Sequence, residues 1–509
     1  MSDNSFYITS PIFYVNDVPH IGHAYTAIAC DVIARFMRLS GKEVKYLTGT
    51  DEHGQKVAGS ARKKGISPQE FVDKNSASFL RMMNVLNISN DDFIRTTELR
   101  HKNSVIALWK KLREKGDIYL GKYAGWYSVR DECFYSEKEL TPQGLAPTGA
   151  PVEWVEEESY FFALSKRQDQ LLEYYEKNPD FIIPSTRRNE VISFVKSGLT
   201  DLSISRTSTD WGIVVPDNKE HFIYVWLDAL TNYIAALGYP DDTTEYKKFW
   251  PANAHIVGKD ILRFHAIYWP AFLMAAEIEL PKSIVAHGWW TNEGEKISKS
   301  LGNTIDPLQL VDEFGVDQVR YFLMREISFG NDGNYSREGL ISRINSELAN
   351  KIGNLLQRTS SLAYKYFDGN IPTISQTVLD EIYDEDLFKE IREFQKRNIE
   401  EMQYFRINKV PENIISIVDK ANIYVDREAP WLLKNDLEKM GKVLYYTLEI
   451  MRYVGIMLQP FTPSAASKML DQLGVRPSER NFIHLTKEFA LKPEAPTNKP
   501  APIFPRFEK

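Results

Sequence analysis

Apolar residues near the start of the chain follow two different spacings in turn. A short apolar run covers residues 6–9, apolar side chains then recur every four residues at Ile28, Val32 and Phe36, and a second run covers residues 44–48. A short continuous apolar run is typical of a buried strand, whereas a spacing of four residues is typical of one helix face. The pattern therefore predicts a strand, a helix and a second strand, the repeating unit of a parallel sheet.

This alternation stops after residue 115 and resumes later. Short apolar runs return at residues 222–226, 255–257 and 283–287, whereas the stretch before them has short aromatic strands, glycine and proline turns and an acidic patch. Helical spacing dominates near the C-terminus, where one predicted apolar face holds Ile414, Val418, Ala421 and Val425 and a second holds Leu444, Leu448, Met451, Gly455 and Leu458. The organisation predicts an α/β fold, in which a Rossmann-type parallel sheet is split by an inserted connective module and followed by an all-α helix bundle.

The pattern divides the chain into six segments. In chain order we predict the first half of the Rossmann-type domain at 1–115, the connective insertion at 116–220, the second half of the Rossmann-type domain at 221–290, a loop and connecting region at 291–345, an α-helical domain at 346–490 and a Pro-rich tail at 491–509. The tail is expected to be extended, and either packed along the surface or partly disordered.

The segment His-Ile-Gly-His that begins at His20 opens the first predicted helix. A helix N-terminus presents free backbone N–H groups and a positive dipole end, which suit phosphate. The imidazoles of His20 and His23 can donate hydrogen bonds to phosphoryl oxygens, and Gly22 leaves room for a nucleotide to lie close. A metal site formed with Asp51 and His53 is the alternative, which we disfavour because nothing else nearby has a ligand spacing.

A second motif, Lys-Ile-Ser-Lys-Ser, begins at Lys296 and lies between Gly294 and Gly302. The ammonium groups of Lys296 and Lys299 and the hydroxyl of Ser298 stand on a glycine-flanked loop, which suits closure on moving negative charge. A solvated charge run is the alternative interpretation of these lysines. Taken together, the two motifs predict the two halves of one triphosphate site.

The two motifs resemble the signature motifs of the class I aminoacyl-tRNA synthetases, and further blocks resemble the methionyl-tRNA synthetases within that class. These blocks read TSPIFY at 9–14, TDEHG at 50–54, YVWLDA at 224–229 and GKD at 258–260, followed by Phe264, His265 and Trp269. Their order along nearly the whole chain is far more specific than either short motif. The resemblance implies ATP-dependent ligation of methionine to its tRNA through methionyl-adenylate.

The resemblance also implies the residues of the active site. ATP is expected to contact His20, Gly22, His23, Lys296, Ser298 and Lys299, of which the two histidines and two lysines are expected to be catalytic. Mg²⁺ is expected with the pyrophosphate, although the sequence shows no acidic cluster that would form a dedicated Mg²⁺ site. A flexible thioether needs an aromatic, adaptable pocket, and the matching methionine-binding residues are Ile12, Tyr14, Asp51, Trp226, Ala229, Tyr233, Ile261, Phe264, His265 and Trp269.

Within this set Asp51 is expected to hold the substrate ammonium. Plain core packing is the alternative role for Trp226 and Trp269. Leu230 stands where many relatives have proline, which affects only that position.

The predicted insertion departs from the zinc-binding relatives. The places of their two Cys-x-x-Cys pairs are taken by Ser128 and Asp131 and by Ala146 and Gly149, and Cys133 stands alone. Because a tetrahedral site of this kind needs thiolates, we expect no structural zinc and no other metal ligand set. The insertion is also too small for the hydrolytic editing domain of the isoleucine, valine and leucine enzymes.

Three residues of the helical region match the anticodon readers of the family. Asn354 and Arg358 are four residues apart and lie off an apolar stripe, so we expect both to face outward. Trp431 follows Pro430 after a predicted helix. The resemblance implies an amide and a guanidinium for base edges and an indole for stacking. The alternative is that Trp431 has a structural role and packs against the end of a helix.

The composition limits the class of protein, its partners and its location. The chain has 509 residues, 43% hydrophobic and 26% charged, which is ordinary for a soluble globular protein. A net charge of −7 is not typical of a nucleic-acid-binding protein, so any RNA-binding surface must be confined to one part of the molecule. Two cysteines exclude a disulfide framework, and we see neither a signal region nor a membrane-spanning run. We expect a cytoplasmic monomer whose partners are tRNA, methionine and ATP, with no membrane.

Three alternatives remain. Another class I synthetase is the nearest, although a cysteine enzyme would need zinc-binding thiolates. A non-charging RNA-binding protein descended from a synthetase would be expected to have lost a signature lysine or histidine. A pantothenate-type ligase or small nucleotidyltransferase would not need the C-terminal helices.

Overall fold

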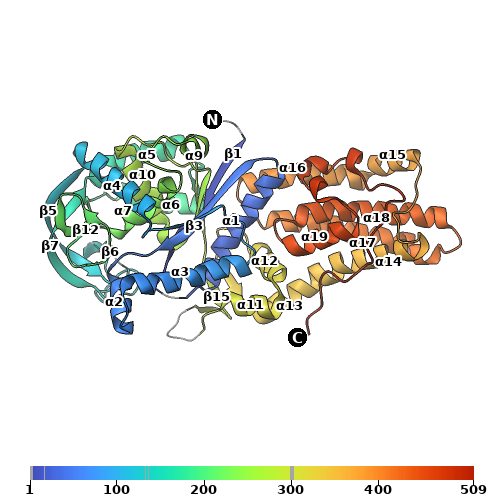
Figure 1. Ribbon diagram of the computed structural model, residues 1–509, viewed down its shortest axis with the longest axis horizontal. Coiled ribbons are helices and arrows are strands. Elements are labelled where there is room, and N and C mark those ends of the chain that lie inside the picture. The colour runs from blue at the N-terminus through green and yellow to red at the C-terminus, as the bar shows by residue number, and fades with distance from the viewer. Residues whose placement is uncertain (1–3, 17, 132, 136, 298–302, 509) are drawn as a thin grey trace. The chain divides into compact units, whose positions relative to one another are not determined.

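The computed structural model describes residues 4–16, 18–131, 133–135, 137–297 and 303–508 (Figure 1). The chain forms two compact units. The first comprises Met1–Pro19, Val44–Asn84 and Asn90–His287, and the second comprises His20–Glu43, Val85–Ser89 and Gly288–Lys509. Among the described residues, none of the helices combines the length and the apolar composition that crossing a membrane requires.

A parallel sheet is the centre of the first unit. Its order is β2-β3-β1-β13-β14-β8, with β4 beside β3. The strands are β1 (Ser5–Thr9), β2 (Phe13–Tyr14), β3 (Glu43–Asp51), β4 (Asp92–Arg95), β8 (Ile182–Ile183), β13 (Ala254–Gly258) and β14 (Ile284–His287). Strands from the two ends of the unit meet where Thr9 lies opposite His255. The predicted split parallel sheet is therefore confirmed.

Two details of this sheet differ from the sequence pattern. The short strand β8 comes from within residues 116–220 and pairs in parallel with β14. The apolar run at 222–226 does not form a strand of the parallel sheet, because β12 (Asn218–Ile223) pairs antiparallel with β10 (Ser205–Arg206) and β11 (Val214–Val215). The chain then turns into helix α7 (Val225–Leu230), so Trp226 lies on a helix. An apolar run of this length fits a strand or a buried helix equally well.

The remaining elements of the first unit cover the sheet or belong to the insertion. Antiparallel strands β5 (Ile118–Ser128), β6 (Cys133–Tyr135), β7 (Glu153–Phe162) and β9 (Leu202–Ser203) form a second sheet. The helices are α2 (Gln55–Lys64), α3 (Pro68–Val85), α4 (Leu99–Glu114), α5 (Gln168–Lys177), α6 (Ser185–Lys196), α8 (Asn232–Ala235), α9 (Thr244–Phe249), the π-helical η4 (Phe264–Tyr268) and α10 (Trp269–Ala275).

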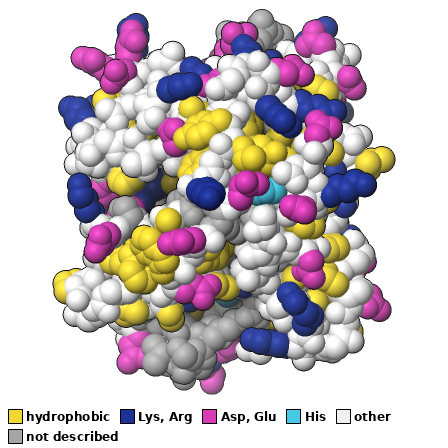
Figure 2. Space-filling view, turned by 90° about the vertical axis from the view of Figure 1, so that its left-hand side faces the viewer, with side chains coloured by type: hydrophobic (Ala, Val, Ile, Leu, Met, Phe, Trp, Pro, Cys, Tyr) yellow, Lys and Arg dark blue, Asp and Glu magenta, His cyan; other side chains and the backbone are white. Residues whose placement is uncertain are grey.

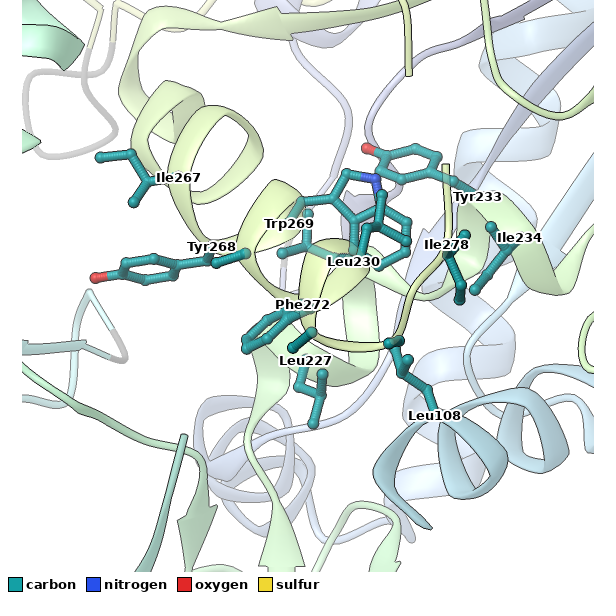
Figure 3. Close-up of a cluster of buried hydrophobic side chains, with 14 of the residues drawn as sticks. Leu108, Leu227, Leu230, Tyr233, Ile234, Ile267, Tyr268, Trp269, Phe272 and Ile278 are labelled. Atoms are coloured by element: carbon teal, nitrogen blue, oxygen red, sulfur yellow. The ribbon is translucent and has the colours of Figure 1, made fainter. Parts of the chain in front are cut away.

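The core of this unit lies where α4, α7, α8 and α10 pack together. Figure 3 shows Leu108, Leu227, Tyr233, Trp269 and Phe272 as members of one cluster, and all five side chains are buried. Figure 2 shows the side of the molecule that carries the β5–β7 ribbon, where hydrophobic side chains gather in patches among interspersed acidic and basic residues. The mixture of signs on this face agrees with the modest net charge.

The second unit is mostly helical. Its elements are α1 (Ile21–Leu39), β15 (Trp290–Asn292), β16 (Glu295–Lys296), α11 (Pro307–Phe314), α12 (Val316–Arg325), β17 (Gly333–Tyr335), α13 (Arg337–Arg343), the π-helical η6 (Ile344–Gly353), α14 (Asn354–Tyr366), α15 (Gln376–Asp384), α16 (Asp386–Gln403), α17 (Lys409–Glu428), α18 (Leu437–Leu458) and α19 (Pro463–Gln472). The predicted apolar faces of α17 and α18 are buried, which confirms the helical domain.

The Pro-rich tail packs along this unit rather than leaving it. Glu494 N–H donates to the carbonyl of Ile371 at 2.9 Å, and Asn345 Nδ2 donates to the carbonyl of Phe507 at 2.8 Å. Phe504 is buried. An extended tail held by backbone hydrogen bonds explains how five prolines are accommodated without a helix.

A buried ion pair joins α1 to the helices of the second unit. Arg320 Nη2 on α12 donates to Asp31 Oδ2 on α1 at 2.6 Å, and both side chains have no exposed area. The same guanidinium donates to the carbonyls of Leu86 and Pro460, at 3.0 and 2.8 Å. Ser89 N–H also donates to Asp31. Charges of this kind are tolerated only when hydrogen bonds satisfy them fully.

We expect Arg320→Met to destabilise the protein strongly. The change leaves a buried carboxylate and several carbonyls short of donors, and breaking a buried pair costs about 3–5 kcal/mol. Lys396→Met is the control, because its ion pair with Glu393 is mostly exposed and such pairs contribute at most about 1 kcal/mol. Urea unfolding followed by circular dichroism measures both variants. Similar midpoints for the two would contradict the role of the buried pair.

Candidate active site

The first signature motif forms the start of helix α1. His20 is the N-cap, and its Nδ1 accepts a hydrogen bond from Gly22 N–H at 3.1 Å. The backbone N–H of His20 in turn donates to Nδ1 of His23 at 3.1 Å, which makes a reciprocal capping box. The two rings stack with centroids 3.8 Å apart. Because each Nδ1 accepts, each neutral imidazole keeps its proton on Nε2, where phosphoryl oxygens are suitable acceptors.

The environment keeps His23 neutral. Burial lowers the pKa of the His23 imidazole well below its ordinary value, and the neighbouring His20 lowers it further. A Cβ atom on Gly22 would lie only 3.0–3.1 Å from the His20 ring. Glycine therefore gives the His20 ring room to cap its own helix, a reason that the sequence did not reveal.

The ends of the second signature loop lie close to this helix start within the second unit. Ile21 N–H donates to the carbonyl of Ile305 at 3.1 Å, and the rings of Tyr25 and Trp290 meet edge to face at 5.5 Å. The backbone of Lys296 pairs with Thr291 in the β15–β16 hairpin. Ser298 and Lys299 lie outside the described residues, as does the side chain of Lys296, so the roles assigned to them stay predictions.

The residues predicted to bind methionine come together in the first unit. The rings of Trp226 and Phe264 stack with centroids 3.7 Å apart, and the Tyr233 hydroxyl lies 2.7 Å from Nε2 of His265. Tyr233 also meets Trp269 at 6.1 Å. Ile12 and Ile261 pack against the same core as Trp226 and Phe264, and Ala229 is buried on α7. Tyr14 and Asp51 are direct partners in the β2–β3 ladder.

The hydrogen bonds of His265 define its tautomer. Its Nδ1 lies 2.9 Å from the carbonyl of Ile261, which can only accept, so Nδ1 carries the proton and Nε2 accepts from the Tyr233 hydroxyl. Burial lowers the pKa of His265 to about 4, so the ring is neutral at physiological pH. His265 stands on the π-helical turn η4, an irregularity common at functional sites.

A second buried imidazole supports Tyr233 from the sheet. The ring of His255 on β13 stacks on Tyr233 at 4.0 Å, and its Nδ1 lies 2.8 Å from Oγ1 of Thr9 on β1. Burial lowers the pKa of His255 well below its ordinary value. Sequence reasoning missed His255, because a histidine within an apolar strand shows no local sign of its distant partner.

The two tryptophans of this cluster differ in how far they are exposed. Trp269 has no exposed area and belongs to the core in Figure 3, whereas Trp226 is half-buried. Trp269 therefore packs in the core, whereas the exposed part of Trp226 can contact a ligand directly. The substrate contacts of both residues stay predictions.

The segment from Asp51 to Gly54 is fixed by contacts from several elements. The Glu52 carboxylate accepts from Arg95 Nε at 2.6 Å, and the Glu52 carbonyl accepts from Trp211 Nε1 at 2.6 Å. Gly54 N–H donates to the Trp211 carbonyl at 3.0 Å. Trp211 comes from the insertion, so the insertion contacts the segment that contains Asp51 directly. No local signal in the sequence pointed to Trp211.

The two turns of the insertion at 128–131 and 146–149 are closed by hydrogen bonds. Asp131 N–H donates to Ser128 Oγ at 3.2 Å, and Gly149 N–H donates to the Ala146 carbonyl at 2.8 Å. The Thr148 hydroxyl donates to the Asp131 carboxylate and links the two turns. Among the described residues, no three His, Cys, Asp or Glu side chains are placed to bind one metal ion. The side chain of Cys133 is not described, so the expected lack of zinc stays a prediction.

The three predicted anticodon readers form one cluster in the second unit. Asn354 is exposed on α14, and the Arg358 guanidinium carbon lies 4.9 Å from the Trp431 ring centroid. Arg358 Nη2 donates to Asp426 on α17 at 2.8 Å. Trp431 remains 37% exposed, which leaves its ring available to a stacking partner. Arg358 and Trp431 therefore lie in contact, and the role of the three residues in anticodon binding stays a prediction.

Comparison with known proteins places the chain in a family. The family profile described as tRNA synthetases class I (M) matches residues 6–150 and 145–360, and the profile for the anticodon binding domain of methionyl tRNA ligase matches residues 375–497. The methionine–tRNA ligase of Rickettsia felis is 66% identical, over 99% of each chain, and that of Rickettsia bellii is 65% identical, over 100% of each chain.

A solved structure agrees closely in fold. The Mycobacterium tuberculosis methionyl-tRNA synthetase in complex with methionyl-adenylate has a TM-score of 0.94 and 46% identity, covering 99% of this chain and 100% of that one. Its apo form has a TM-score of 0.87 and 43% identity, over 99% of each chain. The profiles, the full-length relatives and the shared fold agree with the resemblance of the signature motifs. The chain therefore belongs to the methionine–tRNA ligase family of class I tRNA synthetases.

Proposed function

We propose that this chain ligates methionine to its tRNA in two steps, with methionyl-adenylate as the intermediate. Membership of the family and relatives of 64–66% identity named methionine–tRNA ligase support the reaction. The observation that carries the substrate assignment is the buried Tyr233–His265 pair beside the stacked rings of Trp226 and Phe264. Such aromatic surroundings suit a flexible, polarizable thioether.

In the first step the methionine carboxylate attacks the α-phosphorus of ATP, and pyrophosphate leaves. The carboxylate is already ionised, so catalysis comes from alignment and from stabilisation of the crowded negative charge. His20 and His23 supply Nε2–H donors to the phosphates from a helix N-terminus, whose dipole adds to the attraction. Lys296 and Lys299 neutralise the β- and γ-phosphates as they separate, with Ser298 as a further hydrogen-bonding group.

Methionine binds through its ammonium and its side chain. Asp51 receives the ammonium, and Tyr14 stands beside it in the ladder. The aromatic cluster with Ile12, Ala229, Ile261 and Trp269 encloses the thioether. Mg²⁺ enters with ATP, held chiefly by phosphate oxygens, since Mg²⁺ commonly takes substrate phosphates as ligands.

In the second step the 3′-terminal hydroxyl of the tRNA attacks the activated carbonyl, and AMP leaves. Recognition of the tRNA occurs at its anticodon on the second unit, where Asn354 and Arg358 contact base edges and Trp431 stacks on a base. We further propose that the protein acts as a monomer in the cytoplasm and needs no zinc.

Methionine alone among the twenty amino acids should support ATP–pyrophosphate exchange. Within that reaction, Lys299→Ala should slow the exchange about 10²–10³-fold while methionine binding changes little. The ammonium serves charge that develops mainly in the transition state, so its loss appears in the rate. Lys389→Ala, a surface change on α16, is the control. An unchanged rate for Lys299→Ala at saturating substrates would refute its role, and exchange with another amino acid would refute the proposed function.

The enzyme should work without zinc. Hydrogen bonds between the two turns of the insertion take the place of a metal, since thiolates are missing at the four matched positions. Elemental analysis after chelator treatment is expected to find substoichiometric zinc with full exchange activity. A tightly held equivalent of zinc, or activity lost with the metal, would contradict this proposal.

Trp431→Ala should separate tRNA recognition from the chemistry of activation. Stacking on a single-stranded base is worth about 1–3 kcal/mol, so aminoacylation at low tRNA should fall about 5- to 150-fold while pyrophosphate exchange stays close to wild type. Leu432→Ala, an adjacent and more exposed position, is the control. Equal losses in exchange and aminoacylation, with a lowered melting temperature, would favour a packing role for Trp431.

A further inference from the structure

A buried carboxylate links three elements of the first unit. The two oxygens of Asp228 on α7 lie 2.6 Å from His53 Nδ1 and 2.6 Å from His101 Nε2. All three side chains are buried, and Asp228 and His101 have no exposed area. His53 lies just beyond the end of β3, and His101 stands in the first turn of α4. The carboxylate therefore connects α7 to the end of β3 and to α4.

The ionised state of Asp228 makes both imidazoles donors. Burial by itself would raise the pKa of this carboxyl, but its interactions with His53 and His101 outweigh burial and lower the pKa to about 2. An ionised carboxylate only accepts hydrogen bonds, so His53 donates from Nδ1 and His101 donates from Nε2. Hydrogen bonds to an ionised group are shorter and stronger than neutral ones. The two contacts therefore constrain the distances between α7 and its two neighbours.

Helix α7 needs such an anchor. It has only the six residues Val225–Leu230, and a helix this short is not stable by itself in water. Trp226 and Ala229 are three residues apart and share one face, whereas Asp228 is two residues from Trp226 and lies on a different face. Trp226 stacks on Phe264 with ring centroids 3.7 Å apart, and we call these two rings the aromatic wall. Asp228 thus holds α7 from a side other than the aromatic wall.

The other end of this link is the segment expected to bind the substrate ammonium. Asp51 is the last residue of β3 and lies two residues before His53. Trp211 Nε1 donates to the carbonyl of Glu52, between them, at 2.6 Å, so a second contact holds the same segment. A methionine with its ammonium at Asp51 and its thioether at the aromatic wall requires a fixed separation of β3 and α7. A misplacement of about 1 Å in such a site can cost on the order of 100-fold.

We propose that Asp228 and His53 are positioning residues for methionine, and that their hydrogen bond sets the separation between the end of β3 and the aromatic wall. This inference rests on the proposed function and deepens it, because it names what makes the site fit the length of its amino acid. Neither side chain needs to touch the substrate. The pair favours ligands whose ammonium and side chain reach both places at once.

The test compares methionine with 4-(methylthio)butanoate, which is methionine without its amino group and reaches only the aromatic wall. Pyrophosphate exchange with the full-length protein gives kcat and KM for methionine and the inhibition constant of the analogue. His53→Ala removes the link to β3 but leaves His101 to pair with Asp228. We expect the KM for methionine to rise about 10- to 100-fold, while kcat, the KM for ATP and the inhibition constant of the analogue stay within about threefold of wild type.

Two substitutions of Asp228 separate position from charge. In Asp228→Asn the amide oxygen still accepts from His101, and the amide N–H can donate to His53 Nδ1 once the proton of that ring moves to Nε2. Asp228→Asn should therefore keep the KM for methionine close to wild type. Asp228→Ala loses both links and should raise this KM at least as far as His53→Ala does.

His221→Ala is the control for the loss of a buried imidazole. His221 belongs to the same unit, is also buried, and has its Nδ1 2.9 Å from Ser205 Oγ. Its removal is expected to lower the melting temperature without changing the KM for methionine. A thermal melt of every variant accompanies the kinetics.

The contrary outcomes are distinct. An unchanged KM for methionine in His53→Ala would overturn the proposal. Equal weakening of methionine and its analogue would also overturn it, because His53 would then only support the fold of the pocket. So would a loss in Asp228→Asn as large as that in His53→Ala, since charge and not position would then matter. A wild-type protein without methionine-dependent exchange would instead refute the proposed function.

Discussion

The position of the signature helix depends on one buried ion pair. Asp31 stands on α1, ten residues beyond the start of the helix, and Arg320 joins it to α12 and to the turn between α18 and α19. Burial alone would raise the pKa of Asp31, but Arg320 and Arg35 outweigh it and keep the pKa below its ordinary value. Because an isolated buried charge would be very costly, each partner requires the other. The helix that carries His20 and His23 is thereby anchored to the helical unit.

Burial also decides the ionisation of the histidines, but it keeps these groups neutral instead of leaving them charged. Burial lowers the pKa of His23, His255 and His265 and keeps each ring neutral. A neutral imidazole has one donor and one acceptor, and the hydrogen bond at one nitrogen decides what the other can do. His20 and His23 use Nδ1 to cap their helix. His265 donates from Nδ1 and accepts the Tyr233 hydroxyl at Nε2.

The insertion contacts the segment that contains Asp51. Its two turns are linked by the hydrogen bond between Thr148 and Asp131, and its Trp211 donates to the Glu52 carbonyl beside Asp51. Hydrogen bonds therefore hold the two short turns together among the described residues. The contact through Trp211 explains how the insertion takes part in fixing the candidate site.

The sequence by itself determined the local elements and the types of residue in the site. Strand β1, helix α1 and strand β3 follow from periodicity, because side-chain direction repeats every two residues in a strand and every 3.6 in a helix. The apolar faces of α17 and α18 follow from the same rule. The candidate residues of the ATP, methionine and anticodon sites came from motif blocks, whose residue types already limit the chemistry they can perform.

Only the tertiary structure decided which distant residues meet. Strand β8 joins the parallel sheet from inside the insertion, and the run at 222–226 turns into α7 instead of entering that sheet. Asp228 meets His53 across 175 residues of sequence and His101 across 127, and Trp211 meets Glu52 across 159. Local periodicity carries no information about such pairs, because the stability of a buried hydrogen bond depends on a partner and a desolvated environment that exist only after the chain has folded.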